Sequence, residues 1–147
     1  MLEDTIDFIN QIIKTNNEIG NLIEVEYLIY SDIDDINSSQ MIVEAIILSF
    51  EHKVFTIKAI ANDDTIKLIY GRINANSSQK TIAVSQHKPW SIAIGKRISW
   101  SWALINQQGY PDAIQFEFYE HNPTTSITIQ LITAASSIGV YRLNRII

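Results

Sequence analysis

The chain has 147 residues, of which 46% are hydrophobic and 18% are charged, and it contains no cysteine. This size and composition predict a single domain over residues 1–147, with enough apolar material for one core. The lack of cysteine excludes disulfides, thiolate metal sites and cysteine nucleophiles, and it favours a cytoplasmic location. The acidic N-terminus is unlike a secretory signal, and no apolar run approaches the ~20 residues that span a bilayer, so no membrane association is expected.

The net charge of −5 is unevenly distributed along the chain. Residues 1–64 carry 13 acidic and 3 basic side chains, a net of −10, whereas residues 65–147 carry 3 and 8, a net of +5. Opposite halves of a small domain can simply face each other, but a polarised surface also favours a protein partner or a homo-oligomer. The basic side chains are scattered and the whole chain is acidic, so nucleic-acid binding is not expected.

The first predicted element is a helix over residues 4–15. Ile6, Ile9, Ile12 and Ile13 recur at helical spacing, with polar residues between them. Acidic residues lie in its first turn and Lys14 lies in its last, an arrangement that complements the helix dipole. Asn16, Asn17 and Gly20 end the helix.

From residue 21 onward the apolar pattern has a period of two, which predicts strands separated by polar turns. The run over residues 41–50 is apolar on both faces, so we expect a central strand covered by the helix. The segment over residues 98–107 could form a helix, but alternating Trp and Ser favour a strand. Further strands are predicted over residues 22–30, 54–61, 65–70, 81–85, 90–94, 113–120, 126–133 and 139–146.

The fold class that follows is α+β. We expect the N-terminal helix to pack on a large, twisted, mainly antiparallel sheet of about seven to nine strands, connected as a meander. Twist over so many strands favours curling into a half-barrel or splitting into two sheets. A closed, lipocalin-like barrel is the alternative.

No metal or cofactor site is predicted from the residue patterns. The acidic stretch over residues 32–37 departs from a calcium-binding EF-hand loop, because it lacks the glycine and the closing glutamate. His52, His87 and His121 fall in predicted turns without metal-ligand spacing, and there is no nucleophile elbow or glycine-rich phosphate loop. The chain is therefore not expected to be an enzyme of a recognisable type.

The aromatic stretch that begins at residue 98 is the most informative part of the sequence. On an uninterrupted strand, Trp100 and Trp102 share one face and can meet Phe116 and Phe118 across the turn. Gln115 and Glu117 would then lie on the opposite face, with Ser99 and Ser101. One interpretation is an aromatic core seam. The other is a ligand pocket with a tryptophan floor, to which Arg97, Gln115 and Glu117 supply polar contacts.

The same stretch resembles a pattern found in small bacterial proteins of a family with no assigned function. The resemblance rests on Trp-x-Trp, then Asn-Gln-Gln-Gly-Tyr, an Asp, and Gln-Phe-Glu-Phe, within residues 98–118. It implies no activity and no site residues.

Two functions follow as hypotheses. The first is a small intracellular, non-enzymatic interaction or regulatory module, such as a stoichiometric inhibitor, and it rests on the missing catalytic groups and the polarised charge. The alternative is a small-ligand binding protein or cryptic enzyme whose pocket lies near Trp100 and Trp102.

Overall fold

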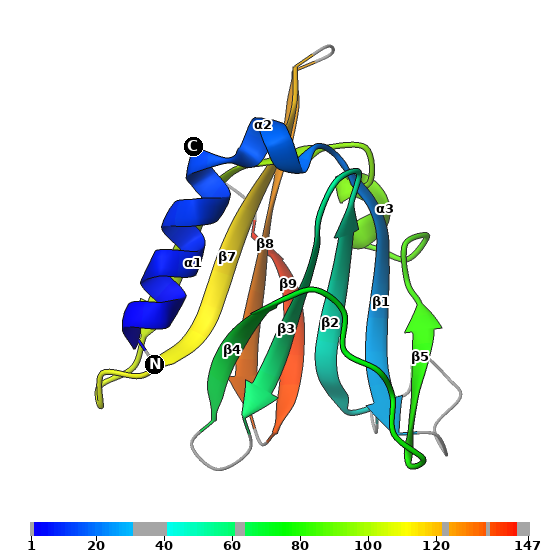
Figure 1. Cartoon of the computed structure of the whole chain (residues 1–147), viewed down its shortest axis with the longest axis vertical. Coiled ribbons are helices and arrows are strands. Elements are labelled where there is room, and N and C mark those ends of the chain that lie inside the picture. Colours follow the sequence, from blue (N-terminus) through cyan, green and yellow to red (C-terminus); the bar gives the residue numbers. More distant parts are fainter. Residues whose placement is uncertain (1, 31–40, 61–63, 122–123, 135, 144–147) are drawn as a thin grey trace.

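The computed structural model of the protein describes residues 2–30, 41–60, 64–121, 124–134 and 136–143. The polypeptide begins with two helices and continues as strands with one further short helix (Figure 1). In chain order the elements of the described residues are α1 (Leu2–Lys14), α2 (Asn16–Ile19), β1 (Leu22–Tyr30), β2 (Val43–Phe50), β3 (Val54–Ile60), β4 (Thr65–Tyr70), β5 (Gln79–Ala83), α3 (Trp90–Ala93), β6 (Arg97–Ile105), β7 (Pro111–Glu120), β8 (Thr125–Ala134) and β9 (Ser137–Leu143).

The strands form two antiparallel sheets and not one closed sheet. The larger sheet has the order β4-β3-β2-β1-β5, and the smaller one is the meander β6-β7-β8-β9. The α+β class and the two-sheet arrangement are thus confirmed. Apolar side chains from both sheets, among them Ile46, Leu48, Phe116 and Ile129, meet in a common core.

The N-terminal helix is present as predicted, but it does not cover the central strand. Phe8, Ile9 and Ile12 of α1 are buried in the core. The helix contacts β6 of the smaller sheet and β4 of the larger one. It therefore lies beside the edge strands of both sheets, where it shields the side of the core from water.

Strand β2 is the middle strand of the larger sheet, as its two apolar faces indicated. Its outer residues Ala45 and Ile47 are fully buried although they lie outside the common core. The connection from β4 to β5 passes over this outer face (Figure 1). Its first residue, Gly71, accepts a hydrogen bond of 2.8 Å from the hydroxyl of Thr56 on β3. This connecting segment, and not α1, covers β2.

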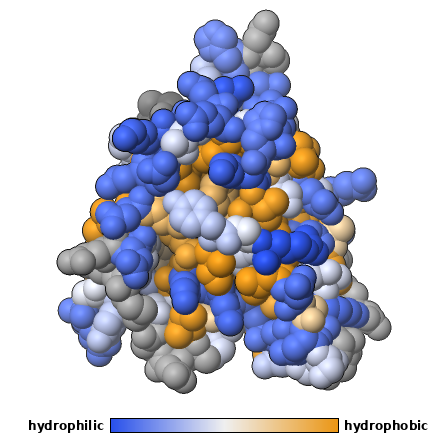
Figure 2. Space-filling model, viewed as in Figure 1, coloured by the Kyte–Doolittle hydropathy of each residue, from blue (hydrophilic) through white to orange (hydrophobic). Residues whose placement is uncertain are grey.

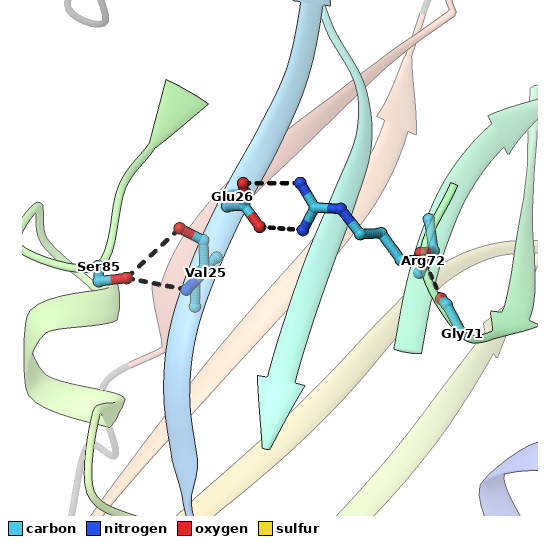
Figure 3. Close-up of polar contacts among 6 residues, drawn as sticks. Val25, Glu26, Gly71, Arg72 and Ser85 are labelled. Carbon is cyan, nitrogen blue, oxygen red and sulfur yellow. Dashed lines mark hydrogen bonds and ion pairs between the residues drawn. The ribbon is translucent and has the colours of Figure 1, made fainter. Parts of the chain in front are cut away.

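Arg72 fastens the same connection to β1. Its guanidinium donates two hydrogen bonds to the carboxylate of Glu26, one of them 3.0 Å long (Figure 3). Beyond β5, Ser85 extends the pairing of that strand with β1, because its hydroxyl accepts a bond of 2.9 Å from the backbone N–H of Val25. Arg72 thus holds the beginning of the connection against β1, and β5, which follows the connection, pairs with the same strand.

The strand predicted over residues 90–94 is wrong, because Trp90–Ala93 forms the short helix α3. The backbone N–H of Ser91 bonds to the carbonyl of His87 at 3.0 Å, and that of Ile94 bonds to Trp90 at 3.0 Å. The turn directs the Trp90 indole into the core, where its N–H donates to the Tyr27 hydroxyl at 2.6 Å. The need to bury this one large side chain overrides the weak alternation of the segment.

A candidate binding groove between α1 and β6

Strand β6 contains a β-bulge that decides where its aromatic side chains point. Ile98 pairs with Phe118, and the next pair is Trp100 with Glu117, so two steps on β6 match one step on β7. Ser99 is the extra residue, and such an insertion moves all following side chains to the other face of the sheet. Beyond the bulge Trp102 lies opposite Gln115.

The predicted aromatic core seam is therefore wrong. Phe116 is buried opposite Ser101, which also points inward and is 4% exposed. Trp100 and Trp102 point outward instead and are 48% and 40% exposed. The expectation failed because it assumed uninterrupted alternation through Ser99.

The two tryptophans line an open groove between β6 and α1, with a volume of about 460 Å³. The helix side is apolar along one stripe at helical spacing, and the strand side is aromatic and aliphatic. The lining residues are Ile6, Ile9, Asn10, Ile13 and Lys14 from α1, and Trp100, Ser101, Trp102, Ala103 and Ile105 from β6. Ile6 and Ile105 are 41% and 48% exposed, so the groove presents apolar surface to water.

One end of the groove is cationic. The C-terminal end of α1 lies beside the beginning of β6, because the side-chain amide of Asn16 donates to the carbonyl of Ile98 at 3.1 Å. Lys14, the last residue of α1, and Arg97, the first residue of β6, therefore flank the same end. Among the described residues, neither has a carboxylate oxygen within 4.0 Å. The opposite end, at Ile6 and Ile105, is apolar.

The five residues singled out from the sequence share the outer face of the smaller sheet, but they do not enclose a cavity. Trp100 and Trp102 line the groove, and Arg97 stands at its cationic end. Gln115 and Glu117 lie on β7, where they pair with Trp102 and Trp100 across the sheet. Gln115 donates to Gln130 at 2.7 Å, and Glu117 accepts from Ser99 at 2.7 Å. These two polar residues are engaged within the sheet.

Two further predictions concern metals and histidines. No group of three or more potential ligands gathers in a metal-binding arrangement within the described part of the chain. His52, His87 and His121 lie in turns or bends, as expected. The acidic stretch over residues 32–37 lies outside the described residues.

The opposite side of the molecule also carries apolar surface. Figure 2 shows apolar side chains near the centre of the view, framed by hydrophilic ones. A cavity of about 300 Å³ lies between the helices and strands β3 and β4. Phe55 and Tyr70 line it, and the ring of Tyr70 packs on Phe8 at 4.6 Å between centroids. Because that apolar surface is engaged in packing α1, the α1–β6 groove is the stronger candidate site.

The helix side of the site was missed by reasoning from the sequence. A signal existed, because α1 has more apolar residues than one core-facing stripe requires, and Ile6 and Ile13 lie beside that stripe. The sequence does not indicate which element packs beside Ile6 and Ile13. Only the packing of α1 along β6 brings Ile6 and Ile13 next to the tryptophans.

Fold and groove together define an α+β protein with two antiparallel sheets and an exposed aromatic groove at a sheet edge. The chain belongs to a Family of unknown function (DUF6334), whose model matches residues 9–147. This match confirms the resemblance to a family with no assigned function. No curated protein and no solved structure matches the chain. None of the described helices has the length and apolarity needed to cross a membrane.

Proposed function

We propose that this protein is a non-enzymatic interaction module that binds a segment of a partner protein in the α1–β6 groove. The observation that carries the proposal is the pair of half-exposed tryptophans on the outer face of β6. Tryptophan is seldom left this exposed in a monomer, and it is enriched among the few residues that dominate binding energy at protein interfaces. The third tryptophan, Trp90, is fully buried.

The charge of the groove defines the chemistry of the partner. Its walls are mainly apolar, Lys14 is the one charged side chain among the described residues that line it, and Arg97 lies at the same end. A complementary segment therefore presents apolar or aromatic anchors followed by one or more acidic side chains. Such a segment would bury the tryptophans and place its carboxylates beside the cations.

The shape of the groove argues for an interaction module and not for the alternative, a small-molecule pocket around the tryptophans. Pockets for small ligands are usually concave enough to bury most of the ligand surface. This groove is open along its length, and Gln115 and Glu117 are bonded within the sheet. An extended or helical segment fits such a surface better than a compact ligand does.

Selection from a library of random peptides tests the proposal. Peptides enriched on the wild-type protein are expected to share apolar anchors next to Asp or Glu. The double variant W100A/W102A should weaken their binding by about 30-fold or more, because even one aromatic anchor at an interface contributes about 2 kcal/mol. The variant K14E should weaken the preference for acidic residues, because it leaves Arg97 as the one cation of the described residues at that end of the groove.

A matched control is Y141A, which removes another exposed aromatic side chain, 55% exposed, from the far edge strand β9. It should leave peptide binding unchanged. Equal binding to wild type and W100A/W102A, or a consensus without acidic residues, would contradict the proposal. A wild-type dimer in sedimentation that W100A/W102A converts to a monomer would also overturn it, because the occupant would then be a second copy.

A further inference from the structure

A second cleft, separate from the groove, lies where α2, β6 and β7 meet. Its volume is about 460 Å³. In contrast to the groove, its walls are polar, and they come from three parts of the chain that the fold brings together. The side chains that matter here are Asn17, Asn21, Arg97, Tyr119, Glu120 and His121.

Arg97 is the organising residue of this cleft. Its guanidinium donates one hydrogen bond of 2.8 Å to the side-chain oxygen of Asn17, which fixes its orientation. Of the other described arginines, Arg72 is paired with Glu26. Arg97 has no carboxylate oxygen within 4.0 Å among the described residues, although the chain has 16 acidic residues against 11 basic ones. A partly buried, oriented guanidinium without a counter-ion has donors left for an external acceptor.

The one carboxylate that lines the cleft is occupied elsewhere. Glu120 lies 3.7 Å from the ammonium of Lys96, which in turn donates to the carbonyl of Ile92 at 2.6 Å. This ion pair offsets the negative charge of Glu120 and leaves the charge of Arg97 uncompensated. Tyr119, the cross-strand partner of Arg97, is hydrogen-bonded to His121 at 3.0 Å. Asn21 adds a side-chain amide that can donate to a ligand oxygen.

We infer that this cleft binds an oxyanion group of a small molecule, a carboxylate or a phosphate, through the fork of Arg97. The guanidinium matches either group with two parallel hydrogen bonds. Asn17 acts as a positioning residue that holds the fork toward the cleft, and the amide of Asn21 supplies a further donor. This inference does not rest on the proposed peptide groove, although Arg97 borders both sites.

Titration followed by amide chemical shifts tests the inference with two probes, inorganic phosphate and acetate. Saturable shifts are expected at residues 17, 21, 97 and 119–121, with a dissociation constant of about 1 mM or tighter. R97Q should weaken binding by about tenfold or more, since charge-assisted hydrogen bonds contribute at least that much. R97K keeps the charge but loses the fork, so it should also bind more weakly.

R142Q provides the matched control, because Arg142 is exposed near the end of β9. It removes the same charge and should leave the titration unchanged. Saturation by phosphate alone assigns a phosphate-bearing ligand, and saturation by acetate alone assigns a carboxylate. Non-saturable shifts with both probes, or equal weakening by R97Q and R142Q, would overturn the inference without affecting the peptide groove.

Discussion

Arg72 and Glu26, which lie 46 positions apart in sequence, form a two-point ion pair across the outer face of the larger sheet. The pair ties the connection between β4 and β5 to strand β1, over the buried side chains of β2. The hydrogen bonds from Arg72 hold the pKa of Glu26 below its usual range. A surface ion pair is thus used to fix a long connection.

Replacing Arg72 with Ala should lower the free energy of unfolding by about 0.5–1 kcal/mol at neutral pH, a modest value because the Arg72 side chain is 43% exposed. A double-mutant cycle with E26Q, measured by urea unfolding, isolates the coupling between the two residues. The coupling should decrease in high salt. A coupling energy of zero at low salt would show that the pair does not hold the connection.

The lowered pKa of Glu26 predicts that the protein loses stability at acidic pH. A carboxyl whose pKa is lower in the folded state stabilises the fold above its unfolded pKa and loses that contribution as the pH falls through the folded value. The stability advantage of wild type over E26Q should therefore be full at pH 7 and decrease progressively in acid, as the pH falls below the usual pKa of a glutamate and through the lowered pKa of Glu26. Urea unfolding of both proteins across this range measures it, and a constant difference would contradict the ion pair.

The raised pKa of Tyr27 predicts a loss of stability at alkaline pH. Burial raises the pKa of Tyr27 to about 12, and the hydrogen bond from Trp90 opposes this effect only in part. The unfolded chain loses this proton first, so stability should fall from about pH 10 upward, by about 1.4 kcal/mol per pH unit until Tyr27 itself ionises. Y27F should lack this fall. At neutral pH it should lose about 1–3 kcal/mol, since the Trp90 N–H remains buried without its acceptor.

Tryptophan fluorescence tests the outward orientation that the β6 bulge imposes. In the double variant W100F/W102F the remaining emission comes from Trp90, which is fully buried, so it should be blue-shifted and resist quenching by acrylamide. Removing two surface indoles should change stability by only about 0.5 kcal/mol. A loss of several kcal/mol would instead place Trp100 and Trp102 in the core.

Gly20 joins α2 to β1 in a backbone conformation, φ 85° and ψ −163°, that is nearly restricted to glycine. A Cβ at this position would lie 2.9 Å from the Cβ of Glu51, whose carboxylate accepts the N–H of Asn21 at 2.7 Å. G20A should therefore cost about 1–3 kcal/mol or more from the backbone conformation and the clash together. The control is G109A, where φ is also positive but the Cβ would meet nothing within 4 Å. Equal losses in thermal unfolding would show that the contact with Glu51 is unimportant.

Much of the fold could be predicted because its strands are long and regularly patterned. The strands over residues 22–30 and 65–70 have the predicted bounds, and residues 98–105 form a strand, as the Trp and Ser alternation favoured. The errors concern a short segment and long-range packing. Trp90–Ala93 forms α3, in which Trp90 is buried and bonded to Tyr27, and the partner of α1 depends on contacts that leave no local trace in the sequence.

The candidate site was predicted only in part. Arg97, Trp100, Trp102, Gln115 and Glu117 do share one sheet face, but no local pattern indicates that Ser99 interrupts the alternation. A bulge is set by cross-strand pairing and not by local composition. Lys14 and the isoleucines Ile6, Ile9 and Ile13 of the groove come from a helix more than 80 residues away in sequence, as the contact between Asn16 and Ile98 illustrates.

The bulge at Ser99 decides which of the alternating side chains of β6 face outward. Downstream of it, indoles and small side chains alternate, and a one-residue change of phase exchanges them. Loss of a single residue here would turn both indoles inward and turn Ser101 and Ala103 outward, so a strand of nearly unchanged composition would lose the aromatic side chains from its outer face. This surface is therefore aromatic because one residue, Ser99, is inserted between Ile98 and Trp100.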